Sequence, residues 1–193
     1  MAKEQTGLIE SVKNGIVSAI KGTGDVASAV ADAVSKTVMA TVKGIGDIAT
    51  SLVSTTSAVA QGTIQAVVEV GGDLGLAAKG VILGVLRGTK EAGAATLETI
   101  SQTAGSVIKS TAEVGGDLGT AAKGLVEGAV EGAKELGLDT MEAASAAATG
   151  ALKGAGEIGS EAGEKVRNAL TGTIAGVKVV LKEPFTKQPS SKS

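Results

Sequence analysis

Residues 70–80 read VGGDLGLAAKG, and residues 114–124 read VGGDLGTAAKG. The two copies differ at one position and lie 44 residues apart, which is four times eleven. Looser versions of the same element are Gly24-Asp25-Val26, Gly46-Asp47-Ile48 and Gly156-Glu157-Ile158. Because a whole multiple of eleven separates the two close copies, the duplication preserves an eleven-residue period along the chain.

Polar residues follow this period on two rows, one starting at Lys3 and the other at Glu10, and few members of either row are large and apolar. Eleven residues make three turns of about 3.67 residues, close to the period of an α-helix. Charge does not alternate with the period of two that a half-buried strand requires. The sequence therefore predicts an all-α protein, built as a very long amphipathic helix or a few long helical segments over residues 7–182.

The eleven-residue period divides the chain into three segments. Residues 1–6 form a short polar lead, residues 7–182 form the repeat region, and residues 183–193 form a tail predicted to be disordered. Pro184 ends the repeat region because proline cannot continue a helix and disfavours helix at the residue before it. Gly71-Gly72 and Gly115-Gly116 would also suit a joint or a hairpin turn, but the unbroken register favours continuous helix through both.

The polar rows form a stripe along one side of the predicted helix, and the two edges of this stripe differ in charge. Four of the eleven rows of the repeat hold most of the charged residues. Two of these rows mix both signs, one is basic and one is acidic, and the last two lie at opposite edges of the charged arc. The basic edge consists of Lys13, Lys79, Lys90, Lys123, Lys134, Arg167 and Lys178. The acidic edge contains Asp73, Asp117, Asp139 and Glu161.

The opposite arc of the helix is apolar and is predicted to face a lipid surface or a partner helix. Its members include Ile9, Ile20, Val42, Val53, Ile64, Val81, Leu86, Leu97, Ile108, Leu125, Val130 and Leu152. A row of small residues runs along one flank, and glycines recur nearby at four-residue spacing, which allows close helix–helix packing. These glycines are Gly80, Gly84, Gly88, Gly124, Gly128 and Gly132.

Such a helix is predicted to need a partner. The chain has 29 Gly. At roughly 1 kcal/mol each in a helix interior, their summed penalty is on the order of 20–30 kcal/mol. The apolar arc must therefore lie on another helix, another copy of the chain, or lipid.

The two charged edges also predict an orientation. When two such helices lie side by side with their apolar arcs on one surface, a parallel pair brings the basic edge of one against the acidic edge of the other. An antiparallel pair brings like charges together. The sequence therefore predicts parallel packing of separate copies, and a homo-oligomer, in preference to hairpins within one chain.

Composition excludes several functions. The chain has no His, Cys, Trp or Tyr, and Phe185 is its single aromatic residue. It therefore lacks the usual nucleophile–base pairs and transition-metal ligands, and we expect no enzyme, no cofactor and no small-molecule substrate. A net charge of −2 and the lack of stacking aromatics argue against nucleic-acid binding. The glycines of residues 71–75 lack the Gly-Lys-Ser/Thr ending of a phosphate-binding loop.

The sequence predicts neither a signal peptide nor a transmembrane helix. No apolar core follows the first residues, so no signal peptide is predicted. The longest uncharged stretch, residues 48–68, is interrupted by threonine, serine and glutamine, so no transmembrane helix is predicted. The expected location is the cytoplasm, either free or peripheral to a membrane or lipid body.

The eleven-residue amphipathic repeat resembles the lipid-surface helices of exchangeable apolipoproteins, synucleins and perilipins, and the repeats of late-embryogenesis-abundant desiccation proteins. Lys79-Gly80, Lys90-Glu91, Lys123-Gly124 and Lys134-Glu135 share the residue character of synuclein repeats. The resemblance implies lipid-surface binding or protective coating. The expected function is a non-enzymatic structural protein that coats a lipid surface in parallel copies. The alternatives are a lipid-free filament, tube or right-handed bundle, and a desiccation protectant. The sequence does not specify the lipid or the copy number.

Overall fold

The computed structural model describes residues 2–23, 25–44, 48–90 and 95–181, with side chains described within 6–22, 25–41, 52–90 and 95–181. In this part of the chain the elements are α1 (Ala2–Thr23), α2 (Val26–Gly44), α3 (Ile48–Glu69), α4 (Leu74–Lys90), α5 (Leu97–Glu113), α6 (Leu118–Leu136), α7 (Thr140–Ile158), α8 (Ser160–Leu170), β1 (Thr173–Ile174) and β2 (Val177–Lys178). The prediction of a helical protein is confirmed, and the prediction of one very long helix is wrong. The first helix begins within the expected polar lead, and the expected tail at 183–193 lies outside the described residues.

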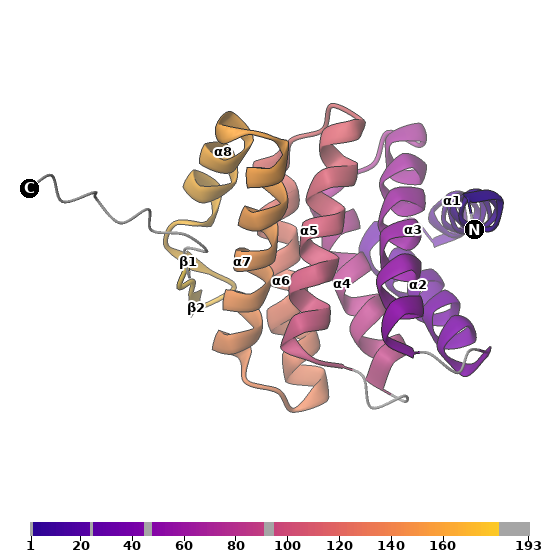
Figure 1. Cartoon of the computed structure of the whole chain (residues 1–193), viewed down its shortest axis with the longest axis horizontal. Helices are drawn as coiled ribbons and strands as arrows, with labels where there is room; N and C mark the ends of the chain where they lie inside the picture. Colours follow the sequence, from indigo (N-terminus) through magenta and orange to yellow (C-terminus); the bar gives the residue numbers. More distant parts are fainter. Residues whose placement is uncertain (1, 24, 45–47, 91–94, 182–193) are drawn as a thin grey trace, which may run out of the picture.

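The helices form two layers. Helices α1, α3, α5 and α7 pack in sequence order in one layer, and α2, α4 and α6 pack in order in the other, with α8 against both α6 and α7. Figure 1 shows α3, α5 and α7 side by side, with α4 and α6 behind them and α1 viewed nearly end-on at the N-terminal end. The short hairpin of β1 and β2 contacts α6 and α7. The repeat region therefore folds back and forth between layers.

The repeated VGGDLG element is where the helix turns. Gly71 has φ +68°, a left-handed conformation that favours glycine, and the N–H of Gly72 donates to the carbonyl oxygen of Val67 at 2.8 Å. Asp73 then accepts a hydrogen bond from the N–H of Leu76 at 2.8 Å, as an N-cap residue does. The element is thus a helix stop followed at once by a helix start. The prediction of continuous helix through it is wrong.

The same chemistry ends α5 and α6. Gly115 has φ +68°, and Asp117 caps α6 by accepting from the N–H of Thr120. Gly137 has φ +72°, and Asp139 caps α7 by accepting from the N–H groups of Met141 and Glu142. Three of the four residues of the predicted acidic edge are therefore helix N-caps, and the fourth, Glu161, lies in the first turn of α8. The acidic row marks helix starts, where carboxylates interact favourably with the free N–H groups of the first turn.

The neighbouring helices α2 and α4, α4 and α6, and α5 and α7 run in the same direction within their layers. A Cβ built on Gly80 would meet the Ala27 carbonyl oxygen at 2.6 Å, and one built on Gly84 would meet that of Ala31 at 2.6 Å, so α4 and α2 advance in the same direction. Successive helices from α3 to α7 run antiparallel and lie alternately in the two layers (Figure 1). The preference for separate copies over hairpins is therefore wrong for this fold. Successive helices of one chain enclose the apolar arcs between the layers, and parallel neighbours within a layer are joined by glycine contacts and ion pairs.

The core between the layers is made of the predicted apolar arc. Equivalent positions spaced by 22 residues are buried in each helix from α3 to α7, and these are Ile64, Leu86, Ile108, Val130 and Leu152. Alanines fill much of the remaining interior, especially in α6 and α7. The partner that the weak helices need is thus supplied by the other helices of the same chain.

One buried hydroxyl in this core is unsatisfied. Thr63 in α3 is fully buried, and its Oγ1 has no hydrogen-bond partner among the described residues. By contrast, the buried Thr111 in α5 donates to the carbonyl oxygen of Val107 at 2.8 Å. Burying a hydroxyl without a hydrogen bond is costly, so Thr63 is a weak point of the core.

Replacing Thr63 by valine is expected to raise the free energy of unfolding by about 1 kcal/mol, because valine keeps the volume and removes the unpaired group. Thr111→Val is the matched control, and it is expected to lower stability by about 0.5–1.5 kcal/mol because it removes a hydrogen bond that exists. Urea unfolding followed by circular dichroism measures both. A destabilised Thr63→Val variant would contradict the assignment.

Candidate functional site

The predicted lipid- or partner-facing residues are mostly inside the chain. Seven of the twelve are buried, namely Ile64, Val81, Leu86, Ile108, Leu125, Val130 and Leu152. Ile9 and Ile20 are half-buried, and the side chain of Val42 lies outside the described residues. Val53 and Leu97 are 46% and 38% exposed. The apolar arc is therefore enclosed between the two layers, with few members on the surface.

The predicted packing glycines lie where helices of one layer touch (same-layer interfaces). Gly80, Gly84 and Gly88 of α4 face α2, and a Cβ on Gly88 would lie 2.8 Å from the Val38 Cβ. Gly124, Gly128 and Gly132 of α6 face α4 in the same way, and a Cβ on Gly128 would lie 2.6 Å from the Lys79 carbonyl oxygen. Each ladder brings its helix close to the backbone or side chains of the preceding helix in the layer.

Ion pairs cross the same interfaces on the outer face. Lys13 of α1 pairs with Glu69 of α3, and Lys79 of α4 pairs with Glu131 of α6, both at 2.7 Å. Arg87 makes the most extensive contact. Its Nη2 and Nε donate to the two carboxylate oxygens of Glu135 at 2.7 and 2.9 Å, and its Nη1 lies 3.7 Å from Asp32. Arg87 thus connects α4 to both neighbours in its layer.

The protonation equilibria reflect these pairs. The hydrogen bond from Lys13 lowers the pKa of Glu69, and the guanidinium of Arg87 lowers the pKa of Glu135. Lys109 of α5 lowers the pKa of Glu157 of α7 in the same way. All these acids are therefore charged at neutral pH. Ion pairs this exposed contribute little individually to the free energy of unfolding. We infer that their main effect is to favour one alignment of the parallel helices along each other.

The acids that pair with these cations come from the mixed rows of the polar stripe, and the predicted acidic edge contributes none of them. In the basic edge, Lys90, Lys123 and Lys134 are exposed, Arg167 lies in the last turn of α8, and Lys178 lies on β2. Lys134 is in the last turn of α6, where a cation interacts favourably with the free carbonyl groups. Sequence reasoning missed the cap role of the aspartates, although glycine followed by aspartate is a recognisable stop and start signal.

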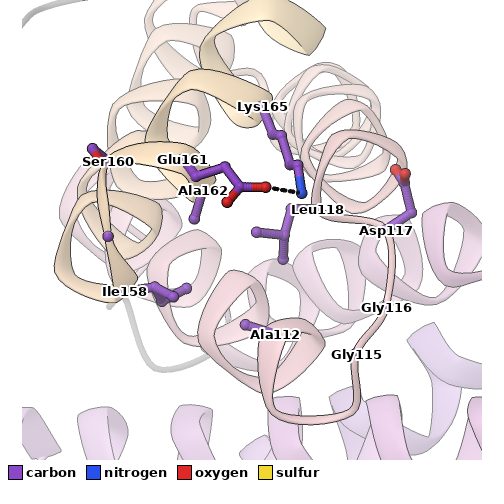
Figure 2. Close-up of a pocket in the computed structure, with 11 residues that line it drawn as sticks. Ala112, Gly115, Gly116, Asp117, Leu118, Ile158, Ser160, Glu161, Ala162 and Lys165 are labelled. Atoms are coloured by element: carbon purple, nitrogen blue, oxygen red, sulfur yellow. Dashed lines mark ion pairs between the residues drawn. The ribbon is translucent and has the colours of Figure 1, made fainter.

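A pocket of about 750 Å³ lies between the α5–α6 turn and the start of α8 (Figure 2). Lys165 and Glu161 form an ion pair of 2.8 Å along one wall, and Asp117 stands at the opposite rim, where it caps α6. Hydrogen bonds from the α6 backbone lower the pKa of Asp117, and Lys165 lowers that of Glu161. Both carboxylates are thus charged at neutral pH.

Within the described ranges, no cluster of acidic side chains is arranged to hold a metal ion. In the same part of the chain, no helix combines the length and apolar character needed to cross a membrane. Comparison with models of known families, with curated proteins and with solved structures gave no match. The resemblance to eleven-residue-repeat proteins therefore stays a prediction, and function must be argued from the apolar arc, the glycine interfaces and the turns.

Proposed function

We propose that this protein is a non-enzymatic amphipathic protein that stores its apolar arc between two helical layers and opens to lay that arc on an apolar surface, foremost lipid. The closed form keeps the large apolar side chains away from water. The open form exposes one continuous apolar face. The same eleven-residue pattern serves both forms, which distinguishes this chain from an ordinary helical bundle.

The observation that carries the proposal is the constant spacing of the buried row. Ile64, Leu86 and Ile108 are 22 residues apart, as are the equivalent residues of α6 and α7. The connections differ, since residues 70–73 join α3 to α4 but only 137–139 join α6 to α7. A two-layer bundle does not need the same total number of residues in each helix and its following turn, because surface turns tolerate added residues. A straightened helix does need it, since each extra residue rotates the following face by about 100°.

The turns are suited to reversible opening. Gly71 and Gly115 are both exposed, and a Cβ at either would meet nothing within 4 Å. Glycine also adopts right-handed helical dihedrals, so each turn is able to extend into helix at modest cost. Opening there separates the layers without breaking the helices.

On a surface, opened copies would lie side by side and parallel. The support for this orientation is the charge pattern of the same-layer interfaces, where Lys79–Glu131 and Arg87–Glu135 join parallel helices. Equivalent pairs are available between copies, because the pattern repeats along the chain. This gives the homo-oligomeric coat that the sequence predicts.

A disulfide lock tests whether opening is required. The Oγ atoms of Ser57 in α3 and Ser106 in α5 lie 3.2 Å apart, and the chain has no Cys of its own. The double variant Ser57→Cys/Ser106→Cys is therefore expected to form a single bridge across this interface. Oxidised, it should bind phosphatidylcholine vesicles at least about tenfold more weakly than when reduced, because α3 and α5 stay together. Vesicle flotation measures the bound fraction.

The control is Ser57→Cys alone, which should bind equally with and without oxidant. Equal binding by the oxidised and reduced double variant would contradict opening at this interface. Assembly that rises with concentration in vesicle-free samples would favour the filament alternative instead. Coil in water that becomes helical only on drying would favour the protectant alternative.

A further inference from the structure

The two layers end in an element that differs from the other helices. Helix α8 has 11 residues, whereas α4 and α5 have 17 and α6 and α7 have 19, and the hairpin of β1 and β2 follows it. Figure 1 shows α8 and the hairpin at the end of the molecule opposite to α1. The exposed residues of α8 are all polar, namely Ser160, Glu161, Glu164, Lys165, Arg167 and Asn168. A polar outer face is what the terminal unit of a repeat fold requires.

Helix α8 lies where the layer of α2, α4 and α6 would place its next helix. A Cβ on Gly75 of α4 would lie 3.2 Å from the Thr120 carbonyl oxygen of α6. Gly119 of α6 is the equivalent of Gly75, 44 residues later, and it faces α8 instead. A Cβ there would lie 3.2 Å from the Ala169 Cβ. The short helix therefore covers the last helix of this layer.

The hairpin covers the last helix of the other layer. In that layer, the Ser101 and Gly105 carbonyl oxygens of α5 face the glycines of α7. Their equivalents in α7, 44 residues later, are Ser145 and Thr149. Strand β2 contacts α7, and Val180 after it lines one surface depression together with Ser145 and Thr149. The end of the hairpin thus lies on the side of α7 that a further helix of the layer would use.

The opposite end of the stack has a face of the kind by which these helices pack. In α3, Gly62 faces α1, since a Cβ there would lie 2.7 Å from the Ile9 carbonyl oxygen. Ser18 holds the same repeat position in α1, 44 residues earlier, and is exposed. A Cβ at Gly15 or Gly22, one helical turn away, would meet nothing within 4 Å. We call this side of the helix the α1 face.

We propose that the α1 face is a docking site for the α7 end of a second copy, and that residues 160–181 are a cap that covers this end. The occupant is a copy of this chain because the contact would continue the α1–α3 and α5–α7 interfaces, in which small residues of the later helix face the backbone of the earlier one. Such a contact is heterologous, so uncapped copies would add head to tail into an open chain. The proposal goes beyond lipid binding and does not rest on it.

Displacing the cap tests the proposal. The double variant Val166→Asp/Leu170→Asp places charges at two fully buried positions of α8 and is expected to release residues 160–181. In sedimentation velocity, the natural chain is expected to be a monomer, and the uncapped variant a series of multimers that grows with concentration. Circular dichroism should show that the helix content of α1–α7 is retained.

Blocking the α1 face provides the matched control. Adding Ser18→Arg to the uncapped variant should return it to a monomer, whereas adding Ser18→Ala, which keeps the residue small, should leave the multimers unchanged. Mixed in equal amounts, the uncapped Ser18→Arg chain and the natural chain should form a one-to-one dimer that does not grow. Each chain then supplies one of the two surfaces.

The proposal is overturned if the uncapped variant stays monomeric or if the natural chain itself forms the multimers. It is also overturned if Ser18→Arg leaves the multimers unchanged, because the contact would then not involve the α1 face. Loss of helix content beyond that of α8 overturns it as well, since residues 160–181 would then be required for the whole fold. No lipid is present, so these results are separable from the test of opening.

Discussion

Replacing Gly150 by alanine is expected to destabilise the protein by about 2–3 kcal/mol. A Cβ at Gly150 in α7 would overlap the carbonyl oxygen and the Cα of Ser101 in α5. These are backbone atoms of a neighbouring helix, so no side chain is able to move aside and the two helices must separate. The usual gain of about 1 kcal/mol from replacing glycine by alanine in a helix is already subtracted from this figure.

The matched control lies in the same helix. Gly156 of α7 is exposed, and a Cβ there would meet nothing within 4 Å. Gly156→Ala is therefore expected to stabilise the protein by up to about 1 kcal/mol through helix propensity alone. Urea unfolding of both variants gives the two signs. Stabilisation by Gly150→Ala would show that α5 and α7 do not approach as closely as this fold requires.

Inserting two residues into one turn is expected to weaken lipid binding at least about tenfold while the closed bundle survives. Two glycines placed between Gly71 and Gly72 lie at an exposed turn, where insertions cost little. In a straightened helix the same insertion rotates everything after it by about 200°, so the apolar faces on its two sides point in nearly opposite directions. Circular dichroism melting reports the closed bundle, and vesicle flotation reports lipid binding.

An insertion of eleven residues at the same site provides the control. A second copy of residues 70–80 adds about three helical turns and returns the face to its original direction. Lipid binding should then recover toward that of the natural chain, although the insertion is longer. Equal binding by all three chains would mean that helices bind lipid one at a time, without a continuous face.

The helical class and its lateral surfaces could be predicted from sequence because they depend on a period. Ile64 and Leu86 belong to the predicted apolar arc and are buried, and Gly84 and Gly128 belong to the predicted ladders and lie against neighbouring backbone. A residue that recurs every eleven positions keeps its direction on a helix whatever that helix packs against. The side of the helix on which a residue lies therefore predicts whether that residue is buried in the core or lies against a neighbouring helix.

The number of helices could not be predicted from the period, because duplication in units of eleven hides the turns. Gly71 and Asp73 sit in register with the stripe, so their local roles as a helix stop and a helix start were outweighed by the unbroken pattern. Local cap chemistry decides such cases, since a left-handed glycine followed by an aspartate N-cap satisfies backbone groups at both helix ends.

The repeat also does not predict which helix packs beside which. The sequence predicts parallel neighbours with opposite charges at their edges, but helices of one chain and helices of separate copies carry the same repeat. The structure supplies the parallel neighbour two helices further along, so that Lys79 reaches Glu131 and Lys109 reaches Glu157. The stagger between such helices depends on the turns, and this is why the acids of the mixed rows were not predicted as partners.

At the α2–α4, α4–α6 and α5–α7 interfaces, glycines of the later helix face backbone atoms of the earlier helix, so the stacking there has a polarity. A chain with one more 44-residue unit would gain one helix in each layer and would form its new contacts without altering the old ones. Molecular length is therefore adjustable by duplication. As in other one-dimensional repeat folds, cooperativity comes from nearest-neighbour coupling, and the terminal helices are the first to fray.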